Sequence, residues 1–448
     1  MKKNLVMSLV AVGLLSSAHA ADDLGSMFKD GKVSGQIREF SILRNTNYTK
    51  ASDYERTANT VGGYLKYETA DYQGLSFGTA FYTTNGFGLG TNPSAKTVDP
   101  TILGAKGTSY SLLGEAYVQY KYNNTTFKGG RQKLDTPLAG SDDARMLPSL
   151  FEAYVVTNTD IKNTTLLAGQ VTQFAAGTFA NGYAGGVLGA TSGYTYTGNT
   201  ATTQGKFTNM GAWAVGKNTA GVTTAAAIYA NGPLKAQVWD YYATDILNAV
   251  YGEANIGWNC LLTNKIKPSF SVQMIKENAI GDRDAGNVNS LFVAGKFDVK
   301  MGDADVYVAY SQESKDDSVA PQAGTAALNK ATITPWGGMP AYTQGMVTRH
   351  QFMAGTKATK VAASYDFKNM GANVVASAYY VSFDMDKDCG YGVARTATEP
   401  GFDIAYKPAV VKNLELKLRG NFPRKYEDSS TNGIRDWDEY RFIVNYNF

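Results

Sequence analysis

The sequence predicts an all-β protein that folds as a single transmembrane antiparallel β-barrel of about 18 strands. Three observations predict this fold: a secretory signal, alternating segments of about ten residues along the whole chain, and a last segment that ends on an aromatic residue. No apolar run is long enough to cross a bilayer as a helix. A chain that spans a membrane without such helices must form a closed barrel, because only these two structures satisfy every backbone polar group in lipid.

The first 20 residues have the features of a secretory signal. Lys2 and Lys3 precede the apolar run Leu5–Leu15, which is too short to span a bilayer, and small residues follow at Ala18 and Ala20. We therefore expect residues 1–20 to be a signal peptide and residues 21–448 to be the barrel, located in the bacterial outer membrane.

The last nine residues alternate strictly between two faces. Aromatic and apolar residues occupy one face, from Tyr440 to Phe448, and Arg441, Asn445 and Asn447 lie on the other. A lipid-facing strand that ends at an interfacial aromatic belt has this pattern. We interpret Phe448 as the C-terminal signal that the barrel assembly machinery recognises.

Composition agrees with many strands and excludes one class of partner. The chain has 47 Gly and 29 Tyr but only 12 Pro, which suits strands flanked by aromatic belts. Its formal net charge is only +3, whereas a nucleic-acid binder would be strongly basic. We therefore expect no nucleic-acid partner.

Eighteen alternating segments have the length of a tilted transmembrane strand. They are Val33–Leu43, Gly62–Ala70, Leu75–Thr84, Leu112–Tyr122, Thr125–Gln132, Leu150–Thr157, Thr164–Phe174, Val222–Ala230, Leu234–Tyr242, Leu247–Trp258, Lys265–Lys276, Ser290–Val299, Ala304–Gln312, Lys357–Phe367, Ala372–Phe383, Pro400–Pro408, Leu414–Phe422 and Asp438–Phe448.

The connections between these segments alternate between tight turns and long polar loops, as expected for periplasmic turns and external loops. Keeping this alternation requires Met210–Lys217 to be a hairpin inside the fourth external loop and not a spanning strand. The pattern leaves open whether Ala175–Gly221 and Glu313–Thr356 fold into the pore. Cys260 falls in a periplasmic turn and Cys389 in an external loop, roughly 25 Å apart or more, so we expect no disulfide between them.

Alternation also assigns charged residues to the lumen. Since a charge on the lipid face is costly, basic residues between apolar neighbours should point inward, and closure brings the first and last strands together at roughly one depth. We predict a basic ladder that guides carboxylate-bearing solutes. The alternative is that these charges only keep the wall polar and pair with Glu415, Asp403 or Glu39. The ladder comprises Arg38, Lys360, Lys417, Arg419 and Arg441.

The central part of the chain resembles a known family. Leu113–Gln119, Gly130–Leu138, Asp142–Pro148, Phe151-Glu152 and Thr157–Thr159 are similar to the corresponding motifs of the OprD-type specific porins. The resemblance implies an 18-stranded barrel narrowed by the third and seventh external loops, a ladder of arginines and lysines, and uptake of small carboxylates or basic amino acids.

By the same motif, Arg131 and Arg145 would belong to the constriction, with Asp135, Asp142 and Asp143 on its acidic side. Arg131 shares a strand face with Phe127 unless Gly129-Gly130 introduces a β-bulge.

The expected function is passive, charge-steered diffusion of small solutes through a narrow pore, without catalysis or cofactor. We expect the barrel to contact outer-membrane lipid and lipopolysaccharide. The sequence is compatible with a monomer or a homotrimer. The alternatives are an unselective diffusion porin, a plugged structural or adhesive barrel, and a hydrolase barrel suggested by the G-x-S-x-G pattern Gly74–Gly78. Asp384, Asp386 and Asp388 are a weak candidate for calcium, because the loop lacks the closing glutamate.

Overall fold

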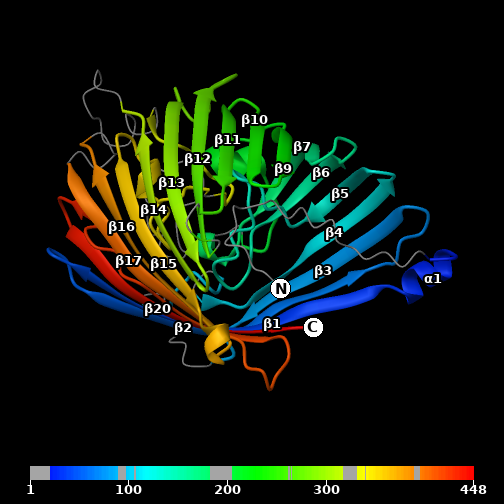
Figure 1. The fold of residues 1–448 in the computed structure, drawn as a ribbon, viewed down its shortest axis with the longest axis horizontal. Coiled ribbons are helices and arrows are strands. Elements are labelled where there is room, and N and C mark those ends of the chain that lie inside the picture. Colours follow the sequence, from blue (N-terminus) through cyan, green and yellow to red (C-terminus); the bar gives the residue numbers. More distant parts are fainter. Residues whose placement is uncertain are drawn as a thin grey trace.

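The computed structural model describes residues 21–88, 97–104, 107–181, 204–260, 263, 265–315, 330–338, 340–387 and 394–448. The signal peptide predicted at 1–20 lies outside them. The described residues form a closed antiparallel barrel (Figure 1). Closure occurs at β1 (Lys32–Tyr48), which pairs with β2 (Tyr54–Glu68) on one side and with β20 (Gly433–Asn447) on the other.

Eighteen of the described strands are long and make up the wall, as the sequence predicts. Two short strands, β8 (Thr208–Asn209) and β19 (Glu427–Ser429), pair with the external ends of β7 and β20. The other wall strands are β3 (Leu75–Asn85), β4 (Tyr110–Tyr122), β5 (Thr125–Gln132), β6 (Leu150–Asn158), β7 (Thr164–Ala175), β9 (Val222–Asn231), β10 (Leu234–Ala243), β11 (Leu247–Gly257), β12 (Ile266–Ala279), β13 (Asn289–Met301), β14 (Ala304–Glu313), β15 (Lys357–Asp366), β16 (Val374–Met385), β17 (Arg395–Tyr406) and β18 (Leu414–Asn421).

Each of the eighteen predicted segments overlaps one wall strand, and Thr125–Gln132 coincides with β5. The largest difference is at β2, which begins at Tyr54, eight residues before the predicted start at Gly62. There the strand continues to pair with β1 above the apolar belt, as in the pair Arg44↔Arg56. Periodicity misses this part because no lipid face requires apolar residues there.

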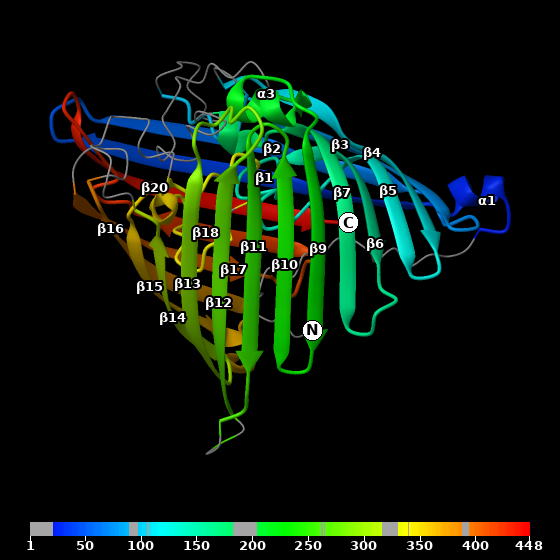
Figure 2. The same ribbon diagram turned by 90° about the horizontal axis from the view of Figure 1, so that it is seen from above.

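The predicted hairpin at Met210–Lys217 is wrong in its secondary structure. The segment forms helix α3 (Met210–Val215), which begins where the Asn209 side chain accepts hydrogen bonds from the backbone N–H groups of Gly211 and Ala212. It ends at Gly216, whose positive φ of 78° closes the helix. The segment does not span the membrane, as predicted, because β7 pairs directly with β9. Figure 2 places α3 at the barrel end that carries the long loops.

The remaining helical elements are short. Helix α1 (Leu24–Lys29) precedes β1, and single 3-10 turns lie at η2 (Thr178–Asn181), η3 (His350–Phe352) and η4 (Phe367–Met370). Within the described ranges, no helix is long and apolar enough to cross a membrane.

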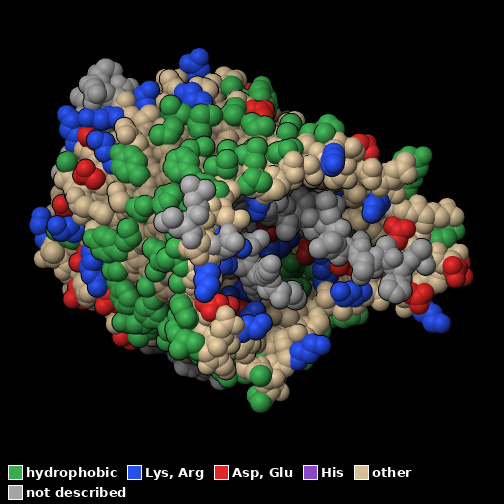
Figure 3. Space-filling model, in the orientation of Figure 1, with side chains coloured by type: hydrophobic (Ala, Val, Ile, Leu, Met, Phe, Trp, Pro, Cys, Tyr) green, Lys and Arg blue, Asp and Glu red, His purple; other side chains and the backbone are tan. Residues whose placement is uncertain are grey.

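The two faces of the wall are divided as alternation predicts. Val33, Ile37 and Phe442 are exposed on the outer surface, and hydrophobic side chains cover much of the wall seen in Figure 3. Arg38 and Arg441 are buried on the inner side. Phe448 closes the seam, since its N–H donates to the Gly35 carbonyl (3.1 Å) and its carbonyl accepts from the Gly35 N–H (3.0 Å).

Candidate pore constriction

The third external loop (residues 133–149) folds into the barrel. Leu134 and Leu138 are buried against the inner wall, and the Leu138 N–H donates to the Tyr241 hydroxyl of β10 at 3.4 Å. Further along the loop, Met146 is buried in a different apolar cluster with Phe40 of β1. The loop therefore crosses the lumen and contacts opposite parts of the wall.

The seventh external loop, between β14 and β15, also folds inward in its described part (330–338 and 340–356), which answers the question left open for Glu313–Thr356. The Tyr342 hydroxyl donates to Oε1 of Glu253 on β11 (2.7 Å), and Nζ of Lys360 on β15 donates to the Gln344 carbonyl (2.6 Å). The two loops meet where the Gly140 N–H donates to the Trp336 carbonyl at 3.1 Å. We call this contact the loop junction; it consists of residues 137–140 and 336–338.

The fourth external loop, between β7 and β9, packs over the loop junction. Nε1 of Trp213 on α3 donates to the Pro335 carbonyl (2.9 Å), and Nε1 of Trp336 donates to the Met210 carbonyl (3.2 Å). The described end of Ala175–Gly221 thus packs against the constriction loops. Residues 182–203 lie outside the described part of the chain.

A buried carboxylate anchors the third loop to the wall. Glu439 of β20 lies 2.7 Å from Arg44 of β1, 2.7 Å from Arg145 of the third loop and 3.2 Å from Arg441. Both oxygens of Glu439 are engaged, and its side chain is fully buried. Asp99 of the second loop joins this cluster through Arg44 at 3.3 Å. Arg44 and Glu439 were not predicted from the sequence, although each lies on the inward face of its strand.

Most of the predicted ladder is ion-paired. Arg38 pairs with Asp143 (2.7 Å) and Arg441 with Glu439 (3.2 Å). On β18, Lys417 pairs with Glu415 (2.9 Å) and Arg419 with Asp403 of β17 (2.6 Å). All five ladder residues face inward as predicted, but Lys360 alone forms no ion pair with a described residue. Pairing with Glu415 and Asp403 is the alternative that the sequence left open.

The prediction that the ladder lies at one depth is wrong. Arg441 is level with Arg419 and with Ile42 in the hydrogen-bonded register, whereas Arg38 is level with Asn445. Arg38 thus lies four positions nearer the periplasmic end than Ile42, or about 13 Å along the strand. The strand ends are staggered, since Gln36 and not Lys32 is level with Asn447, so counting from each end misjudges the heights.

The acidic residues of the third loop are largely compensated. Asp143 pairs with Arg38 and lies 4.0 Å from Lys133, and Asp135 accepts hydrogen bonds from the backbone (3.1 Å) and hydroxyl of Ser141. Burial raises the pKa of Asp142, against the opposing effect of Arg349 and Arg145. These carboxylates therefore hold the loop in place and leave little free negative charge in the lumen.

Arg131 lies away from the other constriction residues. It keeps the outward face that it shares with Phe127, pairs with Glu152 at 3.7 Å and lies 4.4 Å from the Phe207 ring centroid. No bulge occurs at Gly129-Gly130, because β5 keeps an unbroken register with both neighbours. A register shift occurs instead between β6 and β7, where Thr172 of β7 is the extra residue opposite Glu152 and Ala153.

The remaining candidates do not assemble into a site. Asp386 pairs with Lys315 at 3.0 Å, and Asp388 and Cys389 lie outside the described residues. Over the described ranges, no group of three or more His, Cys, Asp or Glu residues is placed to hold a metal ion. Ser76 lies within β3, directly after a turn, and not at the strand-to-helix turn that the hydrolase motif requires.

The inner wall also carries four lysines that were not predicted from the sequence. Lys235, Lys267, Lys296 and Lys300 line a cavity of about 690 Å³ together with only two acidic residues, Asp298 and Asp305. None of the four lysines forms an ion pair with a described residue. Alternation would have found them, since Leu291, Val293 and Phe297 are exposed on the outer face of β13 and leave Lys296 and Lys300 facing inward.

Tyrosines surround two of the inward lysines. Lys296 lies 5.5 Å from the Tyr307 ring centroid and 5.2 Å from that of Tyr342, and Lys360 lies 4.7 Å from Tyr379. Cation–π contacts orient the ammonium groups without neutralising their charge. We call Lys235, Lys267, Lys296, Lys300 and Lys360 the lysine wall.

Acid should loosen the seventh loop through His350. Burial and the positive charges of Arg395 and Arg435 lower the pKa of His350 from 6.5 to about 3, although its Nε2 lies 2.7 Å from the Tyr426 carbonyl. Between these two pH values the detached loop binds a proton that the packed loop does not. Neutral His350 therefore makes its full contribution to stability above pH 6.5. This contribution decreases as the pH falls from 6.5 towards 3, by up to about 1.4 kcal/mol per pH unit.

The measurement is the denaturation midpoint between pH 7 and 4, compared between the native protein and His350→Phe. The variant should lose less stability over this interval. Parallel pH profiles in the two proteins would contradict the assignment to His350.

Comparison with known proteins supplies a family and a fold. The family model described as outer membrane porin, OprD family, matches residues 26–448. The solved structure of OccK9 (OpdG) from Pseudomonas aeruginosa is 20% identical with a TM-score of 0.73, and that of OpdK with vanillate, from the same organism, is 15% identical with a TM-score of 0.72.

A third similar structure, OccK2 (OpdF) from Pseudomonas aeruginosa in complex with glucuronate, is 16% identical with a TM-score of 0.72. All three alignments cover 94% of this chain and 99% of the other. No curated protein sequence matches the chain.

Proposed function

This chain belongs to the OprD family of outer membrane porins, and we propose that it is a selective pore for passive diffusion of small carboxylate-bearing solutes. OpdK was solved with vanillate and OccK2 with glucuronate, and both ligands carry a carboxylate. The proposal extends this solute class to the present chain. It requires no catalytic group and no cofactor, and it holds for a monomer or a homotrimer, since each barrel has its own lumen.

The observation that carries the proposal is the unpaired charge of the lysine wall. The arginines near the third loop share three carboxylates, Glu439, Asp99 and Asp143, which offset most of their positive charge. In contrast, the lysine wall lies along β10 to β15 with few acidic neighbours. Charges of one sign in a narrow cleft with low-dielectric walls raise the local concentration of the opposite ion. We therefore assign the guiding role to the lysine wall, of which Lys360 is the member that the sequence predicted.

The double variant Lys296→Gln/Lys360→Gln tests this assignment. A charge at 4 Å contributes about 1 kcal/mol in water, or roughly a fivefold change in local ion concentration. We expect the anion-over-cation permeability ratio to fall several-fold, as measured from the reversal potential across planar bilayers in a salt gradient. Lys357→Gln is the matched control, because Lys357 is on the outer face of β15 and exposed.

An unchanged permeability ratio in the double variant would contradict the guiding role. Large conductance steps that no carboxylate blocks would instead indicate a general diffusion porin. Absence of conductance would favour a plugged barrel. We further propose that Phe448 is recognised by the barrel assembly machinery and that the exposed apolar belt contacts outer-membrane lipid and lipopolysaccharide.

A further inference from the structure

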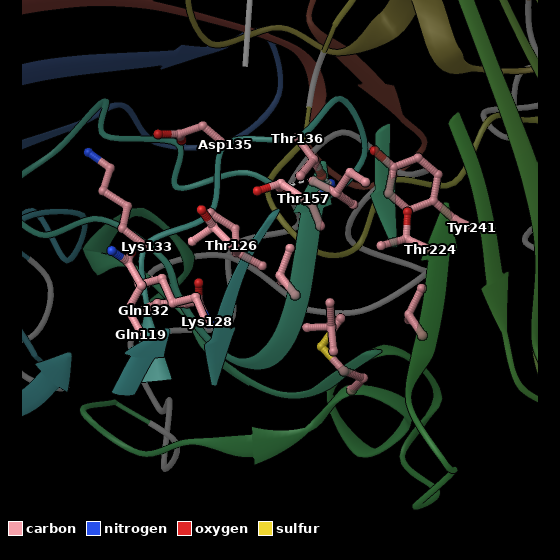
Figure 4. A pocket seen from close by; sticks show the side chains of 17 residues that line it. Gln119, Thr126, Lys128, Gln132, Lys133, Asp135, Thr136, Thr157, Thr224 and Tyr241 are labelled. Carbon is pink, nitrogen blue, oxygen red and sulfur yellow. Dashed lines mark hydrogen bonds between the residues drawn. The ribbon is translucent and has the colours of Figure 1, made fainter. Parts of the chain in front are cut away.

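The third loop covers a small apolar cavity on the inner wall (Figure 4). We call it the side cavity; its volume is about 40 Å³. It adjoins a second cavity of about 220 Å³, the polar cavity, and both are lined by Lys128, Lys133 and Asp135. The apolar lining of the side cavity comes mainly from Leu134, Val155, Leu167, Val171, Met210 and Val222.

Lys128 of β5 lies at the boundary between the two cavities. Its ammonium is 3.7 Å from the ring centroid of Tyr117, and it forms no ion pair or hydrogen bond with a described residue. The nearby carboxylates are already engaged, since Lys66 lies 3.1 Å from Glu115 and 3.3 Å from Glu68. The ammonium of Lys128 therefore has no direct ion-pair partner among the described residues and faces both cavities, which Asp135 also lines.

The wall beside Lys128 has the shape of a slot. In the strand register, Lys128 is level with Val155, Gly169 and Thr224 on three successive strands. Because Gly169 has no side chain, no side chain fills the middle of this row of residues. At the far end, Oγ1 of Thr224 is buried without a hydrogen-bond partner. The slot thus combines an unpaired cation, an apolar middle and an unsatisfied hydroxyl.

We propose that Lys128 and the side cavity bind short-chain aliphatic monocarboxylates, with the carboxylate on Lys128 in the polar cavity and the alkyl tail in the side cavity. This inference rests on the proposed function, because the solute must first enter the lumen. It concerns a residue outside the lysine wall and outside the predicted ladder, and it adds selection by tail length to selection by charge.

The volume of the side cavity sets the length of the tail. One water occupies roughly 10–15 Å³ on this measure, and an apolar cavity of about 150 Å³ accommodates benzene. A cavity of about 40 Å³ therefore fits a tail of two or three carbons and excludes an aromatic ring. A second carboxylate is also excluded, because an unpaired charge in an apolar site is strongly unfavourable.

The test is the block of channel current by acetate, propionate, butyrate, succinate and benzoate, titrated into refolded protein in planar bilayers. Burial of each methylene should lower the half-blocking concentration about fourfold from acetate to butyrate. Succinate and benzoate should block no better than acetate. In Lys128→Met, block by all three short acids should be lost.

Gly169→Ala separates the two parts of the subsite. Its new Cβ would lie 3.1 Å from the Tyr154 carbonyl oxygen and 3.3 Å from Cγ2 of Val155, so it partly fills the slot with little displacement of its neighbours. Acetate block should persist, whereas the gain from acetate to butyrate should disappear. Lys162→Met, in the exposed turn after β6, is the matched control and should behave as the native protein.

The result that overturns the subsite is a chain-length series in Lys128→Met equal to that of the native protein, or a native preference for succinate or benzoate. Failure of the proposed function looks different, because the native protein would then lack anion preference in a salt gradient. The subsite alone is contradicted if the native protein prefers anions but the half-blocking concentration does not change from acetate to butyrate.

Discussion

Replacing Glu439 by glutamine should destabilise the folded barrel by about 3–5 kcal/mol, which is the usual effect of removing one partner from a buried ion pair. Three arginines lie within 3.2 Å of this carboxylate, and their side chains are at most 4% exposed. The glutamine would leave Arg145 and Arg441 without a counterion in a site closed to water. Asp99 would still compensate Arg44, so the loss should not exceed this range.

The measurement is the urea midpoint of the refolded protein in detergent, followed by tryptophan fluorescence. Asp438→Asn is the matched control, because the neighbouring Asp438 pairs with Arg424 at 2.7 Å while remaining 33% exposed. Such a pair contributes about 0–1 kcal/mol. Equal midpoints for the two variants would refute the anchoring role of Glu439.

A double-mutant cycle tests whether the destabilisation by Glu439→Gln acts through the anchoring of the third loop. Glu439→Gln combined with Arg145→Gln removes one of the uncompensated arginines. If the loop is anchored through Arg145, the double variant should be less destabilised than the sum of the single variants, with a coupling of roughly 0.5–3 kcal/mol. Strict additivity would show that Arg145 contributes nothing to the cluster.

The fold was predictable from the sequence because lipid imposes a strict requirement on one face of each strand. Wherever the outer face meets the membrane, apolar residues recur at every second position, as at Leu414, Leu416 and Leu418 of β18. The same rule places Arg419 and Lys417 in the lumen. At the external ends lipid no longer imposes this pattern, which explains why the first half of β2 was missed.

The side of the barrel wall that a residue faces is predictable in this way, but which ion pairs form is not. Arg419 meets Asp403 because β17 and β18 set these residues level, and Arg441 meets Glu439 two positions earlier on its own strand. Alternation fixes neither the register between strands nor the stagger of their ends. The sequence therefore left open whether the ladder is free charge or pairs with Glu415, Asp403 or Glu39. The structure pairs most of it, and the lysine wall has no ion pair with a described residue.

Loop structure was the least predictable part, because no periodic constraint acts on it. The third loop meets the seventh at Gly140 and Trp336, which are far apart in the chain and bear no sequence signal for each other. For Ala139 and Gly337, the contact consists of backbone bridges, which any residue type can form. Inward folding of the third loop was instead implied by its resemblance to a family.

Gly338→Val should open the constriction and raise single-channel conductance roughly twofold or more, since conduction depends on pore diameter and lining groups. A Cβ at position 338 would lie 2.2 Å from the Pro137 carbonyl oxygen and 2.4 Å from Cα of Leu138. Both are backbone atoms and cannot rotate away, so the two loops must separate. The barrel itself should remain folded, because the loop junction takes no part in the ladder between wall strands.

Gly252→Val is the matched control, because a Cβ at Gly252 of β11 would meet nothing within 4 Å. Its conductance should equal that of the native protein. In Gly338→Val, carboxylate block should weaken together with the rise in conductance, since the side cavity loses its cover when the third loop moves. Native conductance and native block in Gly338→Val would mean that the loops repack around the new side chain, and that the loop junction does not set the width of the pore.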